Sequence, residues 1–434
     1  MTSAQPGILR PGKSNNSIRI GGTWELERGW RCGSGARLLR YGAMSDASSK
    51  MRPVMRDLSE DLRRRESQIV RLLERFVRCE SPSHDKPSVD RMAGIIATEW
   101  RRRGAKVTIL RENCRGNHVR AEIWLGTGRP AGQILILGHL DTVYPLGTLA
   151  KTPFRISGGR AWGPGTFDMK AGLAIALAAV DALKSTRLMP RKRLVFFWNS
   201  DEEIDSKSSR HFIELEAHRS DAVLVLEPAY GSEGRLKTAR KGVGTAEIEV
   251  TGRAAHAGLN PEAGVNAVHE LALQTARLMK MSDPRRGVAV QVTVASGGTV
   301  SNVVPESARA QVDLRISKMA DAARLERTLR SLRPILKGAR IKVSGGINRP
   351  PLERTACVRD LFRLAQALMR QVGAPLDECF AGGGSDGNFT AALGIPTLDG
   401  LGAVGDGAHS SREHVIIRSL PERAALLAGL LMTL

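Results

Sequence analysis

The sequence is poor in aromatic residues: Phe, Trp and Tyr together make up 4% of its 434 residues. Proteins that bind single-stranded nucleic acid stack the bases on aromatic side chains, and this chain has few to offer. It also lacks an apolar run of the roughly 20 residues that a membrane-spanning helix needs. The apolar core of a secretory signal is missing as well. These absences argue against a membrane protein and favour the cytoplasm, with the periplasm as the alternative.

Cysteine is scarce too, and its spacing is uninformative for metal binding. The five cysteines are Cys32, Cys79, Cys114, Cys357 and Cys379, and no two of them are separated by two residues. Without such pairs a thiolate zinc site is not expected. The odd number and wide scatter also do not fit a disulfide framework, which favours a reducing compartment.

Acidic residues are outnumbered by basic ones, 44 against 65, which gives a net charge of +21. Such an excess is typical of proteins that bind nucleic acid or anionic surfaces. Here the basic residues are spread along the chain, so we interpret the excess as a property of the surface and expect no nucleic-acid partner. A hydrophobic content of 42% is typical of a globular protein.

The chain divides into four segments by pattern. Residues 1–50 are rich in Gly, Ser and Arg and show no helical or strand period. They are predicted to be a disordered leader, or to precede the true start of translation at Met44, Met51 or Met55. The rest is predicted to form a catalytic domain in two parts, 51–242 and 349–434, and a domain inserted between them, 243–348.

The two parts of the catalytic domain show strands that alternate with helices, which indicates an α/β fold with a central sheet. The predicted helices cover 57–76, 93–103, 170–184, 358–372 and the C-terminus from residue 420. The predicted strands cover 106–110, 118–125, 133–137, 193–198, 222–226 and 395–398.

The inserted segment has a different order. Strands are predicted at 245–251, 288–295, 308–316 and 341–343, with helices at 264–281 and 321–336. This is a β-α-β-β-α-β sequence, which is typical of a ferredoxin-like α+β domain with one sheet covered by two helices.

Three apolar strands of the catalytic domain are followed directly by acidic or histidine residues. His139-Leu140-Asp141 follows the strand at 133–137, Glu202-Glu203 the strand at 193–198, and Glu227 the strand at 222–226. Ligand sites of α/β folds lie at the carboxyl ends of the strands. A metal would supply the positive charge that adjacent acids need, and Asp141 could hold the imidazole of His139.

Two more residues complete the candidate site. Asp168 precedes an apolar helix, where it could equally be a helix cap, and His409 lies in a glycine-rich loop. The full set of two imidazoles and three carboxylates suits a pair of zinc-like ions: His139, Asp168, Glu203, Glu227 and His409.

From about residue 57 to the end, the order of these motifs resembles the di-zinc peptidase family that includes glutamate carboxypeptidase, acetylornithine deacetylase, succinyl-diaminopimelate desuccinylase and aminoacylase. The matching segments are Gly138-His139-Leu140-Asp141-Thr142-Val143, Gly165-Thr166-Phe167-Asp168-Met169-Lys170, Ser200-Asp201-Glu202-Glu203, Leu226-Glu227-Pro228, Ala255-His256-Ala257-Gly258 and Gly407-Ala408-His409-Ser410. The resemblance implies a catalytic α/β domain interrupted by a lid that also serves in dimerisation.

The resemblance also implies two Zn²⁺ ions, with Co²⁺ or Mn²⁺ as substitutes. Asp168 would bridge the ions, His139 and Glu227 would complete one site, and Glu203 and His409 the other. 

In the same scheme two further acids would act beside the metals. Asp141 would orient the imidazole of His139. Glu202 would be the general base that takes a proton from water and passes it to the leaving nitrogen. Glu at position 227 resembles the carboxypeptidase and deacylase branches more than the aminopeptidases.

Five residues resemble the family's substrate-binding positions. His256 would stabilise the oxyanion, in relatives often from the partner subunit, and Asn302 would contact substrate from the inserted domain. Arg315 and Arg349 would hold a substrate carboxylate, for which the guanidinium fork is suited. Gly384 lies in a glycine-rich loop where backbone can approach a ligand. Alternatively, the arginines are surface charges and the others belong to turns.

The sequence therefore predicts a zinc-dependent metallocarboxypeptidase that releases a C-terminal amino acid such as glutamate from a peptide or an N-acylated amino acid. The alternative is an N-acyl amino acid deacylase of the acetylornithine or succinyl-diaminopimelate type. A homodimer is expected.

Overall fold

The computed structural model describes residues 44–434. Helix α1 (Met44–Arg64) begins within the segment predicted to be a structureless leader, so that prediction is wrong for residues 44–50. Residues 44–50 include few apolar side chains and show no hydrophobic period, so the sequence pattern did not indicate that the helix begins before residue 51. The remainder of the predicted leader, with Cys32, lies outside the described residues.

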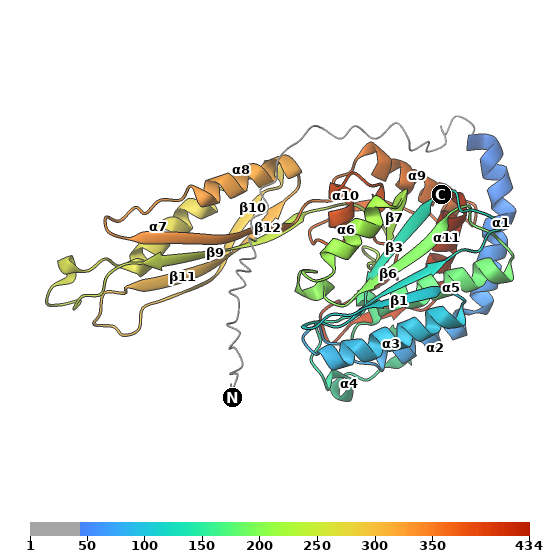
Figure 1. Cartoon of the computed structure of the whole chain (residues 1–434), viewed down its shortest axis with the longest axis horizontal. Coiled ribbons are helices and arrows are strands. Elements are labelled where there is room, and N and C mark those ends of the chain that lie inside the picture. Colours follow the sequence, from blue (N-terminus) through green and yellow to red (C-terminus); the bar gives the residue numbers. More distant parts are fainter. Residues whose placement is uncertain (1–43) are drawn as a thin grey trace, which may run out of the picture. The chain divides into compact units, whose positions relative to one another are not determined.

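The elements of the catalytic domain are shown in Figure 1. Its further helices are α2 (Glu66–Val77), α3 (Lys86–Arg102), α4 (Thr148–Lys151), α5 (Ala171–Ser185), α6 (Arg210–His218), α9 (Ala356–Arg370), α10 (Gly387–Ala392) and α11 (Ser419–Thr433). Its strands are β1 (Lys106–Leu110), β2 (His118–Ile123), β3 (Gln133–His139), β4 (Arg155–Ser157), β5 (Arg160–Trp162), β6 (Arg193–Asn199), β7 (Ala222–Val225), β8 (Leu236–Arg240), β13 (Glu378–Ala381), β14 (Thr397–Leu398), β15 (Gly405–Asp406) and β16 (His414–Ile416).

A six-stranded mixed sheet in the order β1-β2-β6-β3-β7-β14 forms the centre of this domain. Strands β3, β6, β7 and β14 run parallel, while β1 and β2 are antiparallel to their neighbours. Strand β3 is apolar on both faces because helices cover both. Ile134 and Ile136 belong to the larger core, and Leu135 and Leu137 to the smaller core on the opposite face.

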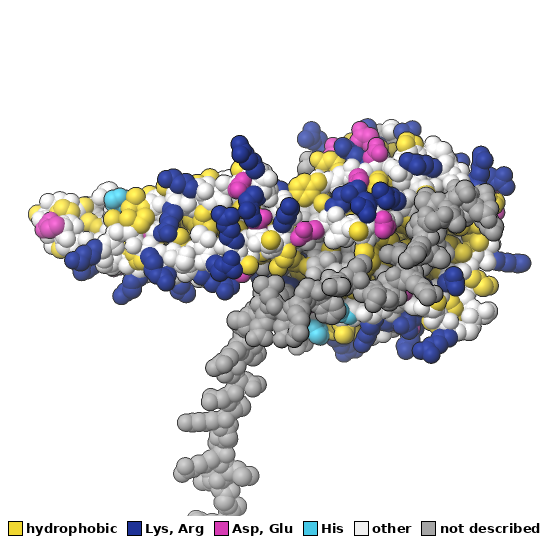
Figure 2. Space-filling view, turned by 90° about the horizontal axis from the view of Figure 1, so that it is seen from above, with side chains coloured by type: hydrophobic (Ala, Val, Ile, Leu, Met, Phe, Trp, Pro, Cys, Tyr) yellow, Lys and Arg dark blue, Asp and Glu magenta, His cyan; other side chains and the backbone are white. Residues whose placement is uncertain are grey.

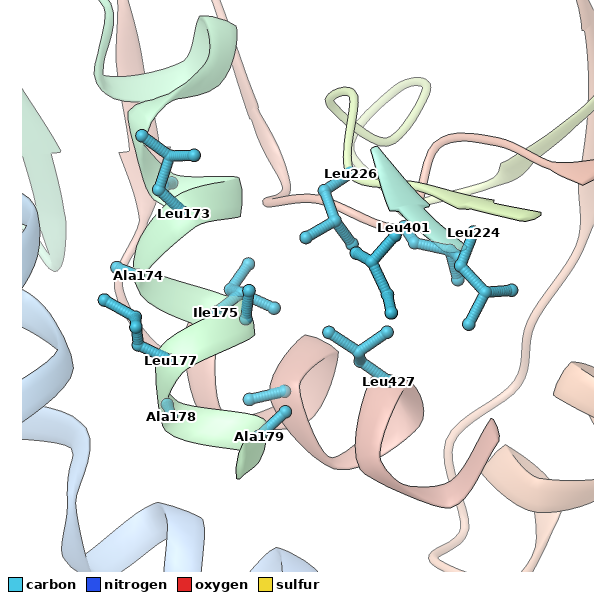
Figure 3. Packing of buried hydrophobic residues seen from close by; sticks show 14 of the residues in the cluster. Leu173, Ala174, Ile175, Leu177, Ala178, Ala179, Leu224, Leu226, Leu401 and Leu427 are labelled. Carbon is cyan, nitrogen blue, oxygen red and sulfur yellow. The ribbon is translucent and has the colours of Figure 1, made fainter. Parts of the chain in front are cut away.

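Most helices pack on the face of the sheet that carries the larger core. Helix α5 is apolar all round and packs beside α11 (Figure 3), where Ile175 and Leu427 belong to one cluster with Leu224. On the same face Trp100 of α3 stacks on Phe196 of β6, with ring centroids 4.0 Å apart. Helix α6 covers the smaller core through Ile213 and Ala217.

The inserted domain contains β9 (Gly242–Thr251), α7 (Ala267–Met279), β10 (Ala289–Gly297), β11 (Ser307–Ile316), α8 (Met319–Arg330) and β12 (Arg340–Arg349). Its four strands form an antiparallel sheet in the order β10-β11-β9-β12. Buried and exposed positions alternate along β9 and β11, because helices cover only one face. The predicted α/β class with a ferredoxin-like insertion is confirmed.

Two element boundaries differ from the prediction. The single helix predicted over 57–76 is two helices, α1 and α2, which meet at Arg65. Helix α8 ends at Arg330 and not at residue 336. Pro334 follows within one turn, and proline disfavours helical backbone at the residue before it.

The small sheets were not predicted. Strands β8 and β13 pair in parallel, and β15, β16, β5 and β4 form an outer sheet. Most of these strands have only two to four residues, too few to show an alternating pattern.

The basic residues do not gather in one tract. Figure 2 shows Lys and Arg side chains scattered over the visible face, among apolar and uncharged ones. This distribution agrees with the interpretation of the charge as a surface property. Among residues 44–434, no helix is long and apolar enough to cross a membrane.

Candidate metal centre and catalytic cavity

Three parallel strands deliver acidic and imidazole side chains to one edge of the central sheet. Strand β3 ends at His139, β6 is followed by the turn that holds Glu202 and Glu203, and β7 by Glu227. The turn after β6 closes at Asp205, whose φ of 80° is left-handed. Aspartate is one of the few residues other than glycine that tolerate this backbone.

Asp168 lies between the two imidazoles of the site. Its Oδ1 is 3.2 Å from Nε2 of His139, and its Oδ2 is 3.3 Å from Nε2 of His409. The backbone at His409 is left-handed, with φ of 60°, a conformation that is rare outside glycine and is often found at functional sites. One carboxylate thus faces both histidines.

The other two predicted ligands complete the cluster. Oε1 of Glu203 is 3.3 Å from Nε2 of His409, and Oε1 of Glu227 is 3.7 Å from Nε2 of His139. His139, Asp168 and Glu203 each offer a ligand atom, and these atoms all lie within 4.8 Å of one another. The structure therefore brings together all five residues that the sequence pattern selected.

Asp141 holds the surrounding backbone and the His139 ring. Nδ1 of His139 donates to the backbone carbonyl of Asp141 at 3.0 Å, and the Asp141 carboxylate lies 3.5 Å from the same atom. That carboxylate also accepts hydrogen bonds from the backbone NH groups of Glu202 and Glu203 and from Ser83 Oγ. The hydrogen bond on Nδ1 leaves Nε2 of His139 facing the acids.

Glu202 is a half-buried acid beside a buried arginine. Its Oε1 is 3.1 Å from Nη1 of Arg349, which also pairs with Asp386 at 2.6 Å. Nη2 of Arg349 donates to the backbone carbonyl of Glu202 and to Ser206 Oγ. Burial raises the pKa of Glu202 well above its ordinary value, although Arg349 opposes the shift. Arg349, which was expected to hold substrate, is therefore engaged by protein atoms.

The donor set fits divalent metal ions. Three buried or half-buried carboxylates converge, and burial together with Asp168 raises the pKa of Glu227 to about 7. Asp168 and Glu203, each with a carboxylate oxygen 3.3 Å from Nε2 of His409, raise the pKa of His409 to about 10. Oε1 of Glu203 is buried and makes no hydrogen bond of good geometry among the described residues. Clustered acids in this state need added positive charge, which a metal supplies.

Glu413 is a residue of the site that the sequence analysis missed. Its carboxylate accepts hydrogen bonds from the backbone NH groups of Gly165, Phe167 and Asp168 at 2.8–3.0 Å, and from the hydroxyl of Tyr144. Glu413 therefore holds the segment that presents Asp168. The only signal in the sequence was an acid four residues after His409, in a stretch that otherwise looks like solvated loop.

Arg240 was missed as well. It forms an ion pair with the fully buried Asp399, with Nε and Oδ2 2.7 Å apart, and its Nη2 is 3.6 Å from Oε2 of Glu227. Its Nη1 donates to the backbone carbonyls of Gly383 and Gly384. Arg240 thus ties the glycine-rich loop to the metal-facing acid Glu227.

The cluster opens into a cavity of about 790 Å³. Gly384 lines this cavity, as predicted for a backbone that approaches substrate. The residues predicted in the inserted domain are not among those that line it. His256 instead accepts hydrogen bonds on Nδ1 from the NH groups of Gly258 and Leu259, and Asn302 lies next to it through a backbone hydrogen bond to Ala257.

Arg315, on the inserted sheet, forms a bidentate pair with Asp313. Its guanidinium is therefore occupied within its own strand. Of the two arginines proposed for substrate, Arg349 is beside the cluster and Arg315 is not among the residues that line the cavity.

Similar proteins were found at the level of sequence. Carboxypeptidase G2 of Pseudomonas sp. (strain RS-16) is 32% identical over 372 residues, which cover 84% of this chain and 89% of that protein. A succinyl-diaminopimelate desuccinylase of Dechloromonas aromatica (strain RCB) is 27% identical over 335 residues, 71% of this chain and 85% of that protein.

Solved structures share the fold. The aminopeptidase PepT of Bacillus cereus superposes with a TM-score of 0.68 at 20% identity, over 85% of this chain and 98% of that one. An M20 family metallo-carboxypeptidase of Sulfolobus solfataricus gives a TM-score of 0.64 at 17% identity, over 84% and 99%. Residues 135–433 match peptidase family M20/M25/M40. This chain belongs to that family.

Proposed function

We propose that the protein is a di-zinc carboxypeptidase that hydrolyses the amide bond before a C-terminal amino acid, in a short peptide or an N-acylated amino acid. The observation that carries the proposal is the position of Asp168 between His139 and His409, with Glu202 half-buried beside them. The 32% identity to carboxypeptidase G2 over most of both chains supports the choice of a carboxypeptidase.

His139, Asp168, Glu203, Glu227 and His409 would hold the ions. Bound zinc lowers the pKa of water and polarises the scissile carbonyl. Glu202 then takes the proton of the attacking water and delivers it to the leaving nitrogen.

Arg349 acts on this reaction by placing Glu202. It contacts the side chain and the backbone carbonyl of Glu202 and is itself held by Asp386. Such a buried pair keeps one geometry because breaking it leaves an unpaired charge.

The second candidate is an N-acyl amino acid deacylase, favoured by the similarity to succinyl-diaminopimelate desuccinylase. Both candidates cleave an amide with the same site, so they differ only in the substrate. Comparison of kcat/KM on N-benzoyl-L-glutamate, N-succinyl-L-diaminopimelate and N-acetyl-L-ornithine separates them. Release of glutamate is expected to be fastest, and preference for either of the other two by tenfold or more would reject the carboxypeptidase.

We further propose a homodimer, in which His256 and Asn302 serve the site of the partner subunit. Support comes from their absence among the described residues that line the cavity of their own chain. Sedimentation would show a dimer, and mixing His256→Ala with Glu202→Gln protein would restore activity if each supplies what the other lacks. A monomer with full activity would contradict this arrangement.

Function in the cytoplasm stays a prediction.

A further inference from the structure

Lys237 is a buried lysine on the wall of the catalytic cavity. It lies on β8 and is 9% exposed, and it lines the cavity together with Tyr230 and Arg240. Its stem packs against Gly400: a Cβ added there would lie 3.3 Å from Cγ of Lys237. The side chain is therefore held in place, in contrast to the flexible lysines of the surface.

The ammonium group of Lys237 has no hydrogen-bond or ion-pair partner in the part of the chain that the structure describes. Burial lowers its pKa, and so does the nearby Arg240, whereas Asp399 and Glu227 oppose the shift. Lysine is almost never buried unless it is paired. A buried lysine without such a partner, on the wall of a catalytic cavity, suggests that its ammonium group binds a ligand.

The acids nearby are already occupied. Asp399 accepts from Ser385 Oγ and from the backbone NH of Gly400, and it pairs with Arg240 at 2.7 Å. Glu227 faces Arg240 on one oxygen and His139 on the other. Both acids act on Lys237 electrostatically, but neither forms a hydrogen bond or a close ion pair with its Nζ within residues 51–434.

Residues of both charges line the cavity. Its acidic part consists of Asp168, Glu202, Glu203, Glu227 and Asp406, and its basic part of Arg160, Lys237 and Arg240. Arg240 is neutralised by Asp399, which leaves Lys237 as a fixed positive charge close to the reaction centre. A substrate that reaches both parts would bring an amide to the acids and an anionic group to the lysine.

We propose that Lys237 binds a carboxylate of the substrate other than the α-carboxylate of the released amino acid. This inference rests on the proposed amide hydrolysis and specifies its substrate class: N-acyl amino acids or short peptides that carry a second carboxylate. That carboxylate can belong to the side chain of the released residue, as in glutamate, or to the acyl group, as in a succinyl group. Both would form the same charge-assisted hydrogen bond.

Matched substrate pairs test the proposal. One pair is N-benzoyl-L-glutamate and N-benzoyl-L-glutamine, which differ in the released side chain. The other is N-succinyl-L-leucine and N-succinamoyl-L-leucine, which differ in the acyl group. In wild-type protein the carboxylate member of at least one pair should have the higher kcat/KM. In Lys237→Met that preference should fall by roughly 10- to 100-fold, the range for a hydrogen bond to a charged group.

Lys241→Met is the matched control, because Lys241 follows the same strand and does not line the cavity. It should keep the wild-type preference. Equal preferences in wild type and Lys237→Met, or an equal loss on all four substrates, would overturn the proposal. The pair that responds identifies whether the released residue or the acyl group reaches Lys237.

A binding measurement separates this proposal from the proposed function. Calorimetric titration with glutarate should give a dissociation constant roughly tenfold higher for Lys237→Met than for wild type and Lys241→Met. Identical constants would overturn the anion subsite even in a protein that hydrolyses none of the four substrates. Complete lack of hydrolysis with glutarate binding intact would instead reject the proposed function alone.

Discussion

Buried acids occur in both domains, but their surroundings differ. In the inserted domain, Glu270 is fully buried, and its carboxylate accepts hydrogen bonds from the backbone NH groups of Ile335 and Leu336 and from Gln274. In the catalytic domain, Glu203 and Glu227 are also buried or nearly so, yet they face other acids and two imidazoles.

Glu270 and Glu227 have opposite pKa shifts. Hydrogen bonds lower the pKa of Glu270 in spite of its burial, whereas burial raises the pKa of Glu227. A structural acid is therefore satisfied by its own chain, and an acid of the site is not. The comparison teaches that incomplete pairing, more than burial itself, marks the residues that await a metal or a substrate.

The largest effect is expected for Glu202→Gln. Glutamine has nearly the same shape but cannot carry the proton from water to the leaving nitrogen, so kcat should fall by roughly 10²- to 10⁴-fold. Metal content should be unchanged, because Glu202 is not among the proposed ligands. Steady-state kinetics and elemental analysis on the same preparation check both statements, and a kcat within tenfold of wild type would refute the role.

A smaller effect is expected for Glu413→Gln. Glu413 shares one property with each of the two kinds of acid. It is satisfied by its own chain, like Glu270, but it holds the Asp168 segment. The amide would turn a donor toward backbone NH groups, so activity or metal affinity should fall roughly 10- to 100-fold. Glu422→Gln, at an exposed residue in the first turn of α11, is the control. Equal metal affinity in both variants would contradict this assignment.

The smallest effect on activity is expected for Glu270→Gln. It should leave kcat/KM unchanged but lower the free energy of unfolding by about 1–2 kcal/mol at neutral pH, because bonds to a charged acceptor are lost.

The stability difference should depend on pH in one direction. The pKa of Glu270 is lowered on folding, so its contribution is complete above the unfolded value of about 4.3 and fades as the pH falls through the folded pKa. Denaturant titrations of both proteins between neutral and acid pH measure this convergence. A difference that grows toward acid pH would show the opposite sign.

Much of the fold and site could be predicted because the relevant signals are local. Apolar runs marked β3, β6 and β7, and the acids that follow each run lie at one sheet edge by geometry. The roles of Glu413 and Arg240 could not be predicted, because each depends on partners far along the chain: Glu413 on residues 165–168, and Arg240 on Asp399. The burial of Lys237 likewise depends on a distant segment, at Gly400. Similarly, nothing in its neighbours indicates that Arg349 pairs with Glu202 and Asp386.

The central claim is a two-metal centre that Asp168 bridges. The most direct test is the number of divalent ions per chain, measured by elemental analysis after dialysis against zinc, for wild type, Asp168→Asn and Lys241→Met. Two ions are predicted for wild type and Lys241→Met, and fewer than two for Asp168→Asn. One ion or none in wild type, or two tightly bound ions in Asp168→Asn, would contradict the account.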